Sequence, residues 1–331
     1  MSTSKPLVSV VIPTYNRAAL LDEALSSAGA QEGAGTLFDE EIVVVDDASS
    51  DEMPAVVRRH PPVRYIRHAT NRGGSAARNT GMAATSGSLI AFLDDDDLWL
   101  PNKLALQVPV LEAHPDAGGV YSHMRLSDEQ GGSLWPDRTR TESGFMFREL
   151  LLDNFMLTPT VLVRREAFGK AGYFDEQLTS SQDYDMLLRL TFHFPFLYAP
   201  GVVAVYRPRS DGTLLRASAT GRHVQTHRAV LEKALGLLQD TPENMRFKEE
   251  ARASVRGAAS RSIGRRAHKL PASTYSNRNV PGPDRSGRSC AGEPPRGPSP
   301  NDRPAPPWRP PKRRWTPRSP ARERRPPDRC A

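Results

Sequence analysis

Four aspartates stand side by side in this sequence, with apolar residues on both sides of them. The run Asp94–Asp97 follows Phe92 and Leu93, and Leu98 and Trp99 come directly after it. The apolar flanks indicate that the run is partly buried, and several buried carboxylates without a counter-charge would be very costly. Mg²⁺ and Mn²⁺ prefer oxygen ligands and bind through one or two carboxylates plus substrate phosphates. The run therefore predicts a divalent-cation site that takes a phosphate-bearing ligand.

Two further polar clusters come directly after short apolar runs that read as buried strands. The run Leu7–Ile12 leads into Pro13–Tyr15, and the run Glu41–Val45 leads into Asp46 and Asp47. The segment Ser88–Leu93 is a further strand, and it leads into the four aspartates. Ligands bind at the carboxyl ends of the strands in open parallel sheets. We therefore expect all three clusters to meet at one edge of the sheet.

The elements between and after these strands alternate in the way of an α/β protein. We expect helices after Asn16 and after Ser49 or Ser50, with these polar residues as caps, and a further helix over Ser75–Thr85. This alternation predicts a mostly parallel sheet with helices on both faces. The remaining expected strands are Val63–Ile66, Gly118–Tyr121, Leu157–Val163 and Val202–Tyr206, and the remaining helices begin at Gln182, Thr226 and Glu243.

The net charge of +7 over 331 residues is unevenly distributed. Residues 271–331 contain 14 Lys and Arg against 5 Asp and Glu, so the rest of the chain is about neutral. That segment also holds 16 of the 30 prolines and both cysteines, Cys290 and Cys330. It has no Leu, Ile, Phe or Met, and we expect a disordered tail because it cannot bury enough apolar surface to fold. A shifted reading frame or a non-native terminus would produce the same abrupt change.

The sequence has no apolar run of about 18 residues and no signal peptide at its start. We therefore expect a cytoplasmic protein, with peripheral contact to the inner face of a membrane as an open alternative. The absence of cysteine before residue 271 excludes a disulfide framework or a cysteine-based zinc site in the folded part.

Several motifs, in order and with the right spacing, resemble those of family 2 glycosyltransferases. The motifs are Val10–Arg17, Val44–Ser49, Asn71–Gly81, Phe92–Pro101, Leu162–Phe168, Gly172–Glu176 and Gln182–Arg189. The resemblance extends from about Pro6 to Tyr206 and implies the GT-A nucleotide-diphospho-sugar transferase fold. It also implies a donor-binding half over residues 1–115, an acceptor-binding half over 116–225, and C-terminal helices over 226–270.

The same resemblance assigns roles to individual residues. It implies that the donor nucleotide is bound by Pro13, Tyr15, Asp47, Gly74, Arg78 and Asp95. It implies Asp96 as the ligand of Mn²⁺ or Mg²⁺, although a run of four aspartates can be aligned in more than one register. Asp183 matches the general base, in a position where the family usually has Glu-Asp and this chain has Gln182 before it.

These roles predict an inverting transfer of a sugar from a nucleotide diphosphate to an acceptor hydroxyl. One carboxylate takes the proton of the hydroxyl, and the metal ion stabilises the leaving diphosphate. We expect a glycan or lipid-linked acceptor, in cell-surface glycan or polysaccharide synthesis. No specific nucleic-acid partner is expected.

Two alternatives remain open from the sequence. One is a nucleotidyltransferase, although residues 13–16 offer neither the glycine-rich phosphate loop nor the lysine expected of that class. The other is a non-enzymatic binder of anionic polymers through the basic tail.

Overall fold

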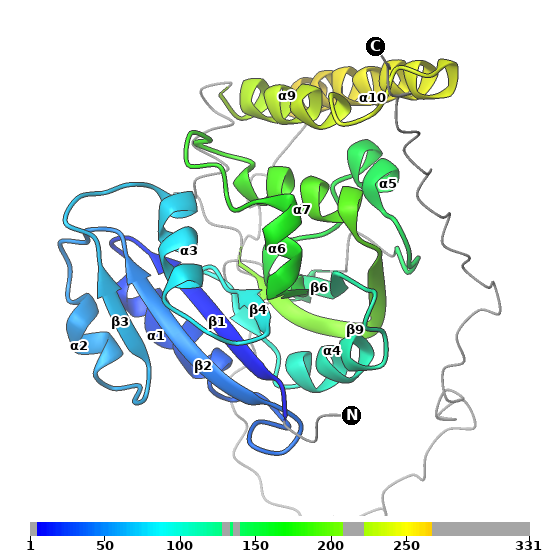
Figure 1. Ribbon diagram of the computed structural model, residues 1–331. Coiled ribbons are helices and arrows are strands. Elements are labelled where there is room, and N and C mark those ends of the chain that lie inside the picture. The colour runs from blue at the N-terminus through cyan, green and yellow to red at the C-terminus, as the bar shows by residue number, and fades with distance from the viewer. Residues whose placement is uncertain (1–4, 128–132, 135–139, 208–221, 267–331) are drawn as a thin grey trace, which may run out of the picture. The chain divides into compact units, whose positions relative to one another are not determined.

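The computed structural model describes residues 5–127, 133–134, 140–207 and 222–266 (Figure 1). The expected tail, residues 271–331, lies outside these ranges. Within them the strands form a nine-stranded sheet in the order β3-β2-β1-β4-β8-β6-β9-β5, with β7 paired to β6. The strands are β1 (Leu7–Thr14), β2 (Asp39–Asp46), β3 (Arg64–Arg67), β4 (Leu89–Phe92), β5 (Leu98–Trp99), β6 (Gly119–Ser127), β7 (Ser133–Leu134), β8 (Val161–Arg164) and β9 (Phe196–Tyr206).

The two halves of the sheet differ in strand direction. In the first half β3, β2, β1 and β4 are all parallel to their neighbours. In the second half β8 is antiparallel to both β4 and β6, whereas β6 and β9 are parallel and β5 is antiparallel to β9. The expected α/β fold class is confirmed, and its parallel part coincides with the predicted donor-binding half.

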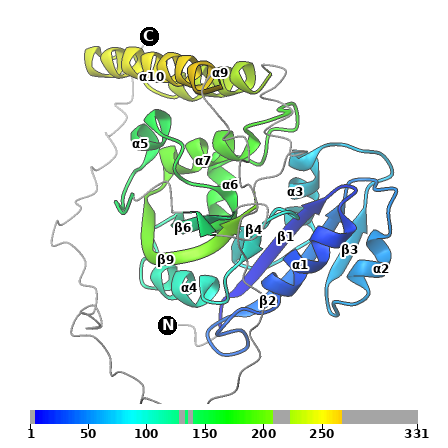
Figure 2. The same cartoon turned by 180° about the vertical axis from the view of Figure 1, so that it is seen from behind.

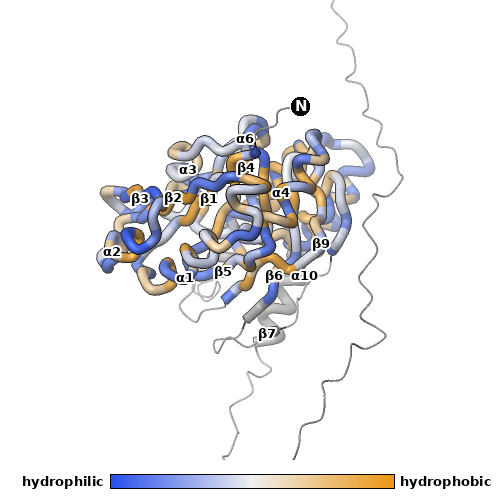
Figure 3. The backbone as a smooth tube through the Cα atoms, turned by 90° about the horizontal axis from the view of Figure 1, so that it is seen from below, coloured by the Kyte–Doolittle hydropathy of each residue, from blue (hydrophilic) through white to orange (hydrophobic). Residues whose placement is uncertain are grey.

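Helices cover both faces of the sheet (Figures 1 and 2). One face packs on α1, α2 and α4, and the other on α3, α5, α6 and α7, with α9 and α10 packed outside α7 and α5 (Figure 1). The helices are α1 (Ala18–Ala28), α2 (Met53–Val57), α3 (Gly74–Ala83), α4 (Lys103–Glu112), α5 (Phe147–Leu152), α6 (Arg165–Ala171), α7 (Gln182–His193), α9 (Arg222–Leu235) and α10 (Pro242–Arg266), with a 3-10 turn, η1, at Thr158–Thr160. The chain coloured by hydropathy has its most apolar stretches in this interior (Figure 3).

The strand β1 shows why the sheet is buried on both sides. Val10 and Ile12 point into the core with α1, whereas Val11 between them points into the core with α3. Successive residues of a strand face opposite sides, so a strand covered on both faces must be apolar throughout. On the α3 side the helix lies so close that a Cβ on Gly81 would be 2.4 Å from Val11 Cγ1.

Two expected helix caps are wrong. Asn16 has a positive φ of 53° and lies before the helix, and its Oδ1 accepts a hydrogen bond from the Ser50 backbone N–H at 2.7 Å. Asp51 instead satisfies an amide of the first turn of α1: its Oδ2 accepts a hydrogen bond from the Ala18 N–H at 2.9 Å. The α2 helix starts only at Met53, because residues 49–51 are used to hold the turn after β1.

The last two helices begin earlier than the sequence predicts. Here α9 begins at Arg222 and ends at Leu235, directly before Gly236. The α10 helix begins at Pro242, where proline is favoured in a first turn because no N–H partner is lost. No helix in the described part of the chain is both long and apolar enough to cross a membrane.

Candidate active site

The parallel register brings the three polar clusters to one edge, as the sequence predicts. Thr14 at the end of β1 is level with Asp46 at the end of β2. The Asp47 N–H donates to the Thr14 carbonyl at 2.9 Å, so Asp47 also stays next to the end of β1. On the other side of β1, β4 ends at Phe92, level with Val11, and leads into the four aspartates.

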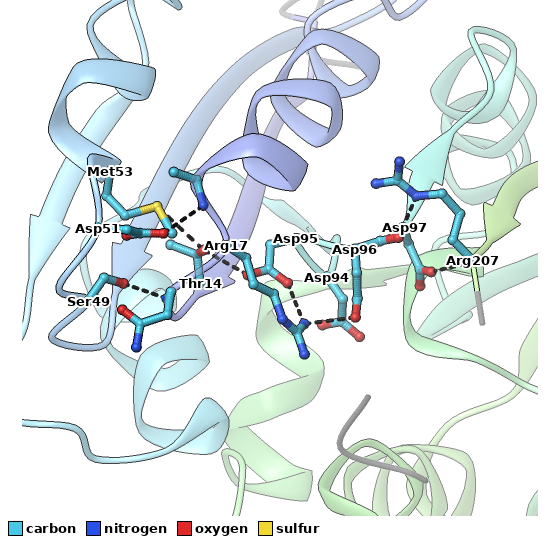
Figure 4. Close-up of polar contacts among 12 residues, drawn as sticks. Thr14, Arg17, Ser49, Asp51, Met53, Asp94, Asp95, Asp96, Asp97 and Arg207 are labelled. Carbon is cyan, nitrogen blue, oxygen red and sulfur yellow. Dashed lines mark hydrogen bonds and ion pairs between the residues drawn. The ribbon is translucent and has the colours of Figure 1, made fainter. Parts of the chain in front are cut away.

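A basic residue lies between two of the four aspartates (Figure 4). The Arg17 terminal nitrogen NH1 is 2.8 Å from Asp95 Oδ1 and also 2.8 Å from Asp96 Oδ2. The other Asp95 oxygen accepts a hydrogen bond from Thr14 Oγ1 at 2.7 Å. Asp95 is only 3% exposed, whereas the Asp96 side chain is 20% exposed and therefore open to a ligand.

Burial dominates the electrostatics of two of these carboxyl groups. Burial raises the pKa of Asp95 to about 6, and Arg17 opposes this shift while Asp96 adds to it. Burial also raises the pKa of Asp97 well above its ordinary value, helped by the charges of Asp94 and Asp96. A buried carboxyl is easier to charge when a cation is added, so this cluster favours a bound cation.

Arg207, at the end of β9, fixes the backbone of the aspartate run. Its Nε donates to the Asp96 carbonyl at 2.7 Å, and its own backbone N–H donates to Asp97 Oδ1 at 3.3 Å (Figure 4). A terminal nitrogen of Arg207 also pairs with Glu23 of α1. Asp97 is therefore used to shape the loop, as expected for a supporting acid.

Arg78 is buried on α3 and contacts the first of the four aspartates. It forms an ion pair with Asp94, and its guanidinium lies over the Phe174 ring, 5.4 Å from the ring centre. A Cβ on Gly74, one turn earlier, would lie 3.1 Å from Arg78 NH1, so only glycine leaves this guanidinium its full space. Among the described residues, the Arg78 Nε is buried without a hydrogen-bond partner. An anionic ligand could satisfy it.

Asp47 is buried and its carboxylate organises the start of α3. Its Oδ1 accepts from the Arg72 N–H at 2.8 Å, and its Oδ2 accepts from the Gly73 N–H at 2.7 Å. His68 Nδ1 is 2.7 Å from the same Oδ1. Gly73 has a φ of 89°, which glycine adopts without strain, and this lets both amides point at Asp47. Asp47 thus makes three protein contacts at the position where the resemblance implies a base contact.

Pro13 and Tyr15 lie on either side of Thr14 and differ in exposure. Pro13 is buried in β1, whereas Tyr15 follows the strand and is 47% exposed. Tyr15 directly follows Thr14, which bonds to Asp95, and its exposed aromatic ring is available for stacking on a flat ligand. Of the two, Tyr15 has the exposure that a ligand-binding residue needs.

Asp183 is the second residue of α7, and it is half-buried. One of its oxygens, Oδ2, accepts a hydrogen bond from Thr158 Oγ1 at 3.3 Å. Asp183 lies within electrostatic reach of Arg78: burial alone would lower the pKa of Arg78, but Asp94 and, to a lesser extent, Asp183 and Asp95 raise it. Arg78 is thus influenced by carboxylates from both halves of the fold.

Asp185, two residues later on α7, has a structural environment. Arg189 donates to its Oδ2 from Nε at 3.0 Å and from NH2 at 2.7 Å. Lys233 of α9 lies 2.9 Å from the other oxygen, Oδ1. Asp185 therefore ties α7 to α9 and has no oxygen left for a substrate proton.

Asn79 joins α3 to the loop of residues 172–176, which the sequence does not reveal. Its Nδ2 donates to the Phe174 carbonyl and to Glu176 Oε1, both at 2.9 Å, and its Oδ1 accepts from the Phe174 N–H at 3.0 Å. Asn79 is therefore part of an interface between the two halves.

The residues fit a divalent cation of the kind that relies on a ligand for most of its coordination. Among the described residues, no group of three or more His, Cys, Asp or Glu side chains is placed to hold a metal ion. Two carboxylate oxygens, from Asp95 and Asp96, nevertheless converge on one cationic nitrogen at 2.8 Å. One or two carboxylates are what Mg²⁺ takes from a protein when substrate phosphates complete its coordination.

Sequence reasoning missed the roles of Arg17, Arg207 and Thr158. Arg17 is the last residue of the motif Val10–Arg17. The only feature of the sequence that could have indicated its role is a positive charge three residues after the strand, in a protein with four consecutive aspartates at the end of another strand. Arg207 and Thr158 have no such signal, because their contacts join elements that are far apart in the sequence.

Residues 9–172 match the family model described as glycosyl transferase family 2. An uncharacterized glycosyltransferase from Haemophilus influenzae is 30% identical over 190 residues, which cover 56% of this chain and 62% of the relative. The chain thus spans less than two-thirds of the length of this relative.

Solved structures share the fold. Staphylococcus aureus TarS 1–349 in complex with UDP-GlcNAc has a TM-score of 0.59 at 21% identity, covering 75% of this chain and 70% of that chain. A mannosyltransferase from Pyrobaculum calidifontis, in complex with GDP-Man and Mn²⁺, has a TM-score of 0.57 at 24% identity, covering 81% and 78%. Through residues 9–172, the chain belongs to glycosyl transferase family 2, and its fold is that of the GT-A glycosyltransferases.

Proposed function

We propose that this protein is a metal-dependent, inverting glycosyltransferase that moves a sugar from a nucleotide diphosphate to an acceptor hydroxyl. The observation that carries the proposal is the position of Arg78. It forms an ion pair with Asp94 in the predicted donor half, and the charge of Asp183, in the predicted acceptor half, helps to raise its pKa. A donor carboxylate cluster and a separate acceptor carboxylate are the two parts that a direct sugar transfer requires.

The chemistry of the site supports a nucleotide diphosphate as donor. The buried Arg78 Nε, without a hydrogen-bond partner in the described residues, can donate to a phosphate oxygen. Tyr15 offers an exposed ring for the nucleobase, two residues after the buried Pro13, and Gly74 leaves space for the Arg78 guanidinium. The structural relatives bind UDP-GlcNAc in one case and GDP-Man with Mn²⁺ in the other, which supports the same class of donor here.

Asp96 is the residue that would hold Mn²⁺ or Mg²⁺, with Asp95 behind it. When bound, such an ion stabilises the negative charge that grows on the leaving diphosphate. Asp95 is fixed by its hydrogen bond from Thr14, so it contributes charge without moving. The carbonyl of Asp96 is fixed by Arg207, which orients the more exposed Asp96 carboxylate.

Asp183 would act as the general base. Its Oδ2 accepts a hydrogen bond from Thr158 at 3.3 Å, and the other oxygen, Oδ1, would take the proton of the acceptor hydroxyl. The proton moves to Asp183 as the acceptor oxygen bonds to the anomeric carbon and the diphosphate leaves from the opposite side. A single displacement of this kind inverts the anomeric centre. The carboxylate of Asp185 does not compete for this role because Arg189 and Lys233 engage it.

The acceptor is proposed to be a glycan or a lipid-linked sugar, in cell-surface glycan or polysaccharide synthesis. The commonest theme of the family supports this assignment.

Calorimetry of nucleoside diphosphate binding tests the donor assignment. We expect UDP or GDP to bind in the presence of Mn²⁺ and to bind at least tenfold more weakly in EDTA. Asp96→Ala should remove this metal dependence, whereas Asp116→Ala, a carboxylate in the α4–β6 connection, should leave it unchanged. Equal affinity of the unmodified protein in Mn²⁺ and in EDTA would refute the metal-dependent donor site.

A further inference from the structure

We infer that Arg17 competes with the divalent cation for Asp95 and Asp96, so that the metal ion must displace the guanidinium before it can bind. The displaced guanidinium is then available to the donor diphosphate. This inference rests on the proposed function, because it concerns the regulation of the same site. It explains why one side chain should be placed between the two carboxylates that the metal needs.

The contact itself carries the first part of the argument. A single nitrogen, Arg17 NH1, lies 2.8 Å from Asp95 Oδ1 and 2.8 Å from Asp96 Oδ2 (Figure 4). A cation that touches both oxygens satisfies the electrostatic need of the buried pair without a metal ion. Two cations cannot occupy the single position between these two oxygens, and a metal ion placed close to the guanidinium would be repelled by it. The guanidinium and the metal ion therefore exclude each other from this position.

The local backbone allows the side chain to move while the turn stays in place. The Asn16 N–H donates to Ser49 Oγ at 2.9 Å, and the Asn16 side chain accepts from the Ser50 N–H at 2.7 Å. The Ala18 N–H donates to Asp51 at 2.9 Å. These bonds fix the backbone on both sides of residue 17. The Arg17 side chain is 24% exposed and attached through several rotatable bonds, so it can swing toward solvent by changing rotamer.

The carboxylates remain ready when the guanidinium leaves. Asp95 keeps its hydrogen bond from Thr14 at 2.7 Å, and the Asp96 backbone keeps its bond from Arg207 at 2.7 Å. A guanidinium released beside a bound diphosphate can pair with it through two parallel hydrogen bonds. The metal ion and the diphosphate then both favour the state in which Arg17 has left the two carboxylates. Their binding must be cooperative, and the coupling is reciprocal.

The test measures Mn²⁺ binding without any nucleotide, by the electron paramagnetic resonance signal of free Mn²⁺. We expect Arg17→Gln to bind Mn²⁺ roughly three- to tenfold more tightly than the unmodified protein, because the competing state is gone. At saturating Mn²⁺ the same variant should bind UDP or GDP several-fold more weakly. Arg59→Gln is the matched control: it removes the same charge from a surface pair with Asp22, and it should change neither affinity.

Arg17→Lys guards against a folding defect, since it keeps a cation that is shorter and lacks the planar fork. It should fold like the unmodified protein and bind Mn²⁺ with an affinity between that of the unmodified protein and that of Arg17→Gln. If Mn²⁺ affinity is unchanged or weaker in both Arg17 variants, while Asp96→Ala abolishes Mn²⁺ binding, the competition is refuted and the metal site stands. If Asp96→Ala leaves Mn²⁺ binding intact, the proposed metal site itself is wrong.

Discussion

Replacing Asn79 by aspartate removes two hydrogen-bond donors from the contact between α3 and the loop of residues 172–176. The shape of the side chain stays the same, and the acceptor for the Phe174 N–H is kept. The oxygen that replaces Nδ2, however, faces the Phe174 carbonyl and the Glu176 carboxylate, which both lie 2.9 Å from the present nitrogen. The change therefore converts two attractive contacts into two repulsive ones.

The magnitude follows from the burial of the two partners. A buried acceptor left without its donor costs about 1–3 kcal/mol, which applies to the Phe174 carbonyl. The Glu176 side chain is 43% exposed, so its repulsion with a new aspartate is screened and adds less than about 1 kcal/mol. Together these contributions should lower the free energy of unfolding of Asn79→Asp by about 1–4 kcal/mol. At about 2–4 °C per kcal/mol for a folded part of this size, that corresponds to a fall of roughly 2–16 °C in Tm.

Urea denaturation, combined with a double-mutant cycle, measures this. Glu176→Gln alone should be nearly neutral, because its amide oxygen can still accept from Asn79. In the Asn79→Asp background, Glu176→Gln should recover about 0.5–1 kcal/mol, since the new amide can donate to the aspartate. The loop leads toward α7, so kcat with an acceptor should fall by about tenfold while donor affinity stays within threefold. A destabilisation below about 0.5 kcal/mol together with an unchanged kcat would refute this reasoning.

Two other predictions concern the pH dependence of stability and the packing of α3. Because burial raises the pKa of Asp95 from 3.8 to about 6, its contribution to stability is greatest below about pH 4 and is lost as pH rises through about 6. Addition of Mn²⁺ should therefore raise Tm more at pH 7.5 than at pH 5.5, and equal shifts in thermal melting would contradict the assignment. Gly81→Ala should destabilise by about 1–3 kcal/mol, because the new Cβ would lie 2.4 Å from Val11 Cγ1. Gly169→Ala in α6, where nothing lies within 4 Å, should be neutral or slightly stabilising in the same urea titration.

Three strands of the first half, β1, β2 and β4, could be predicted because each contains an apolar run that leads into polar residues. The prediction of Leu7–Ile12, for example, lies within the observed β1, Leu7–Thr14. The convergence of the three polar clusters followed from the parallel direction alone. Strand direction in the second half could not be derived in this way: whether β8 is antiparallel to β4 depends on the connections between them, and the strand sequence is equally apolar in either direction.

The individual acids of the site were identified more easily than their partners. Asp95 and Asp183 stand in motifs that imply their roles. Arg17, although it is the last residue of a motif, and Thr158 gain their roles only because folding places them beside those acids. The helix caps failed for a related reason. Asn16 and Ser49 have side chains that often cap helices. Here the Asn16 side chain accepts from the Ser50 N–H and the Ser49 hydroxyl accepts from the Asn16 N–H, so the two loops bond to each other, which a local sequence pattern cannot reveal.

Single-turnover transfer by Asp183→Asn tests the central claim most directly, with an acceptor chosen from a panel of simple glycosides. Asparagine keeps the shape of the side chain but cannot take the acceptor proton. We expect the transfer step to slow by roughly 100- to 10,000-fold, while nucleotide affinity in Mn²⁺ stays within a few-fold. Asp185→Asn should mainly lower Tm, through loss of the pairs with Arg189 and Lys233. Transfer at a near-normal rate by Asp183→Asn would contradict the account, because the base would then be another residue.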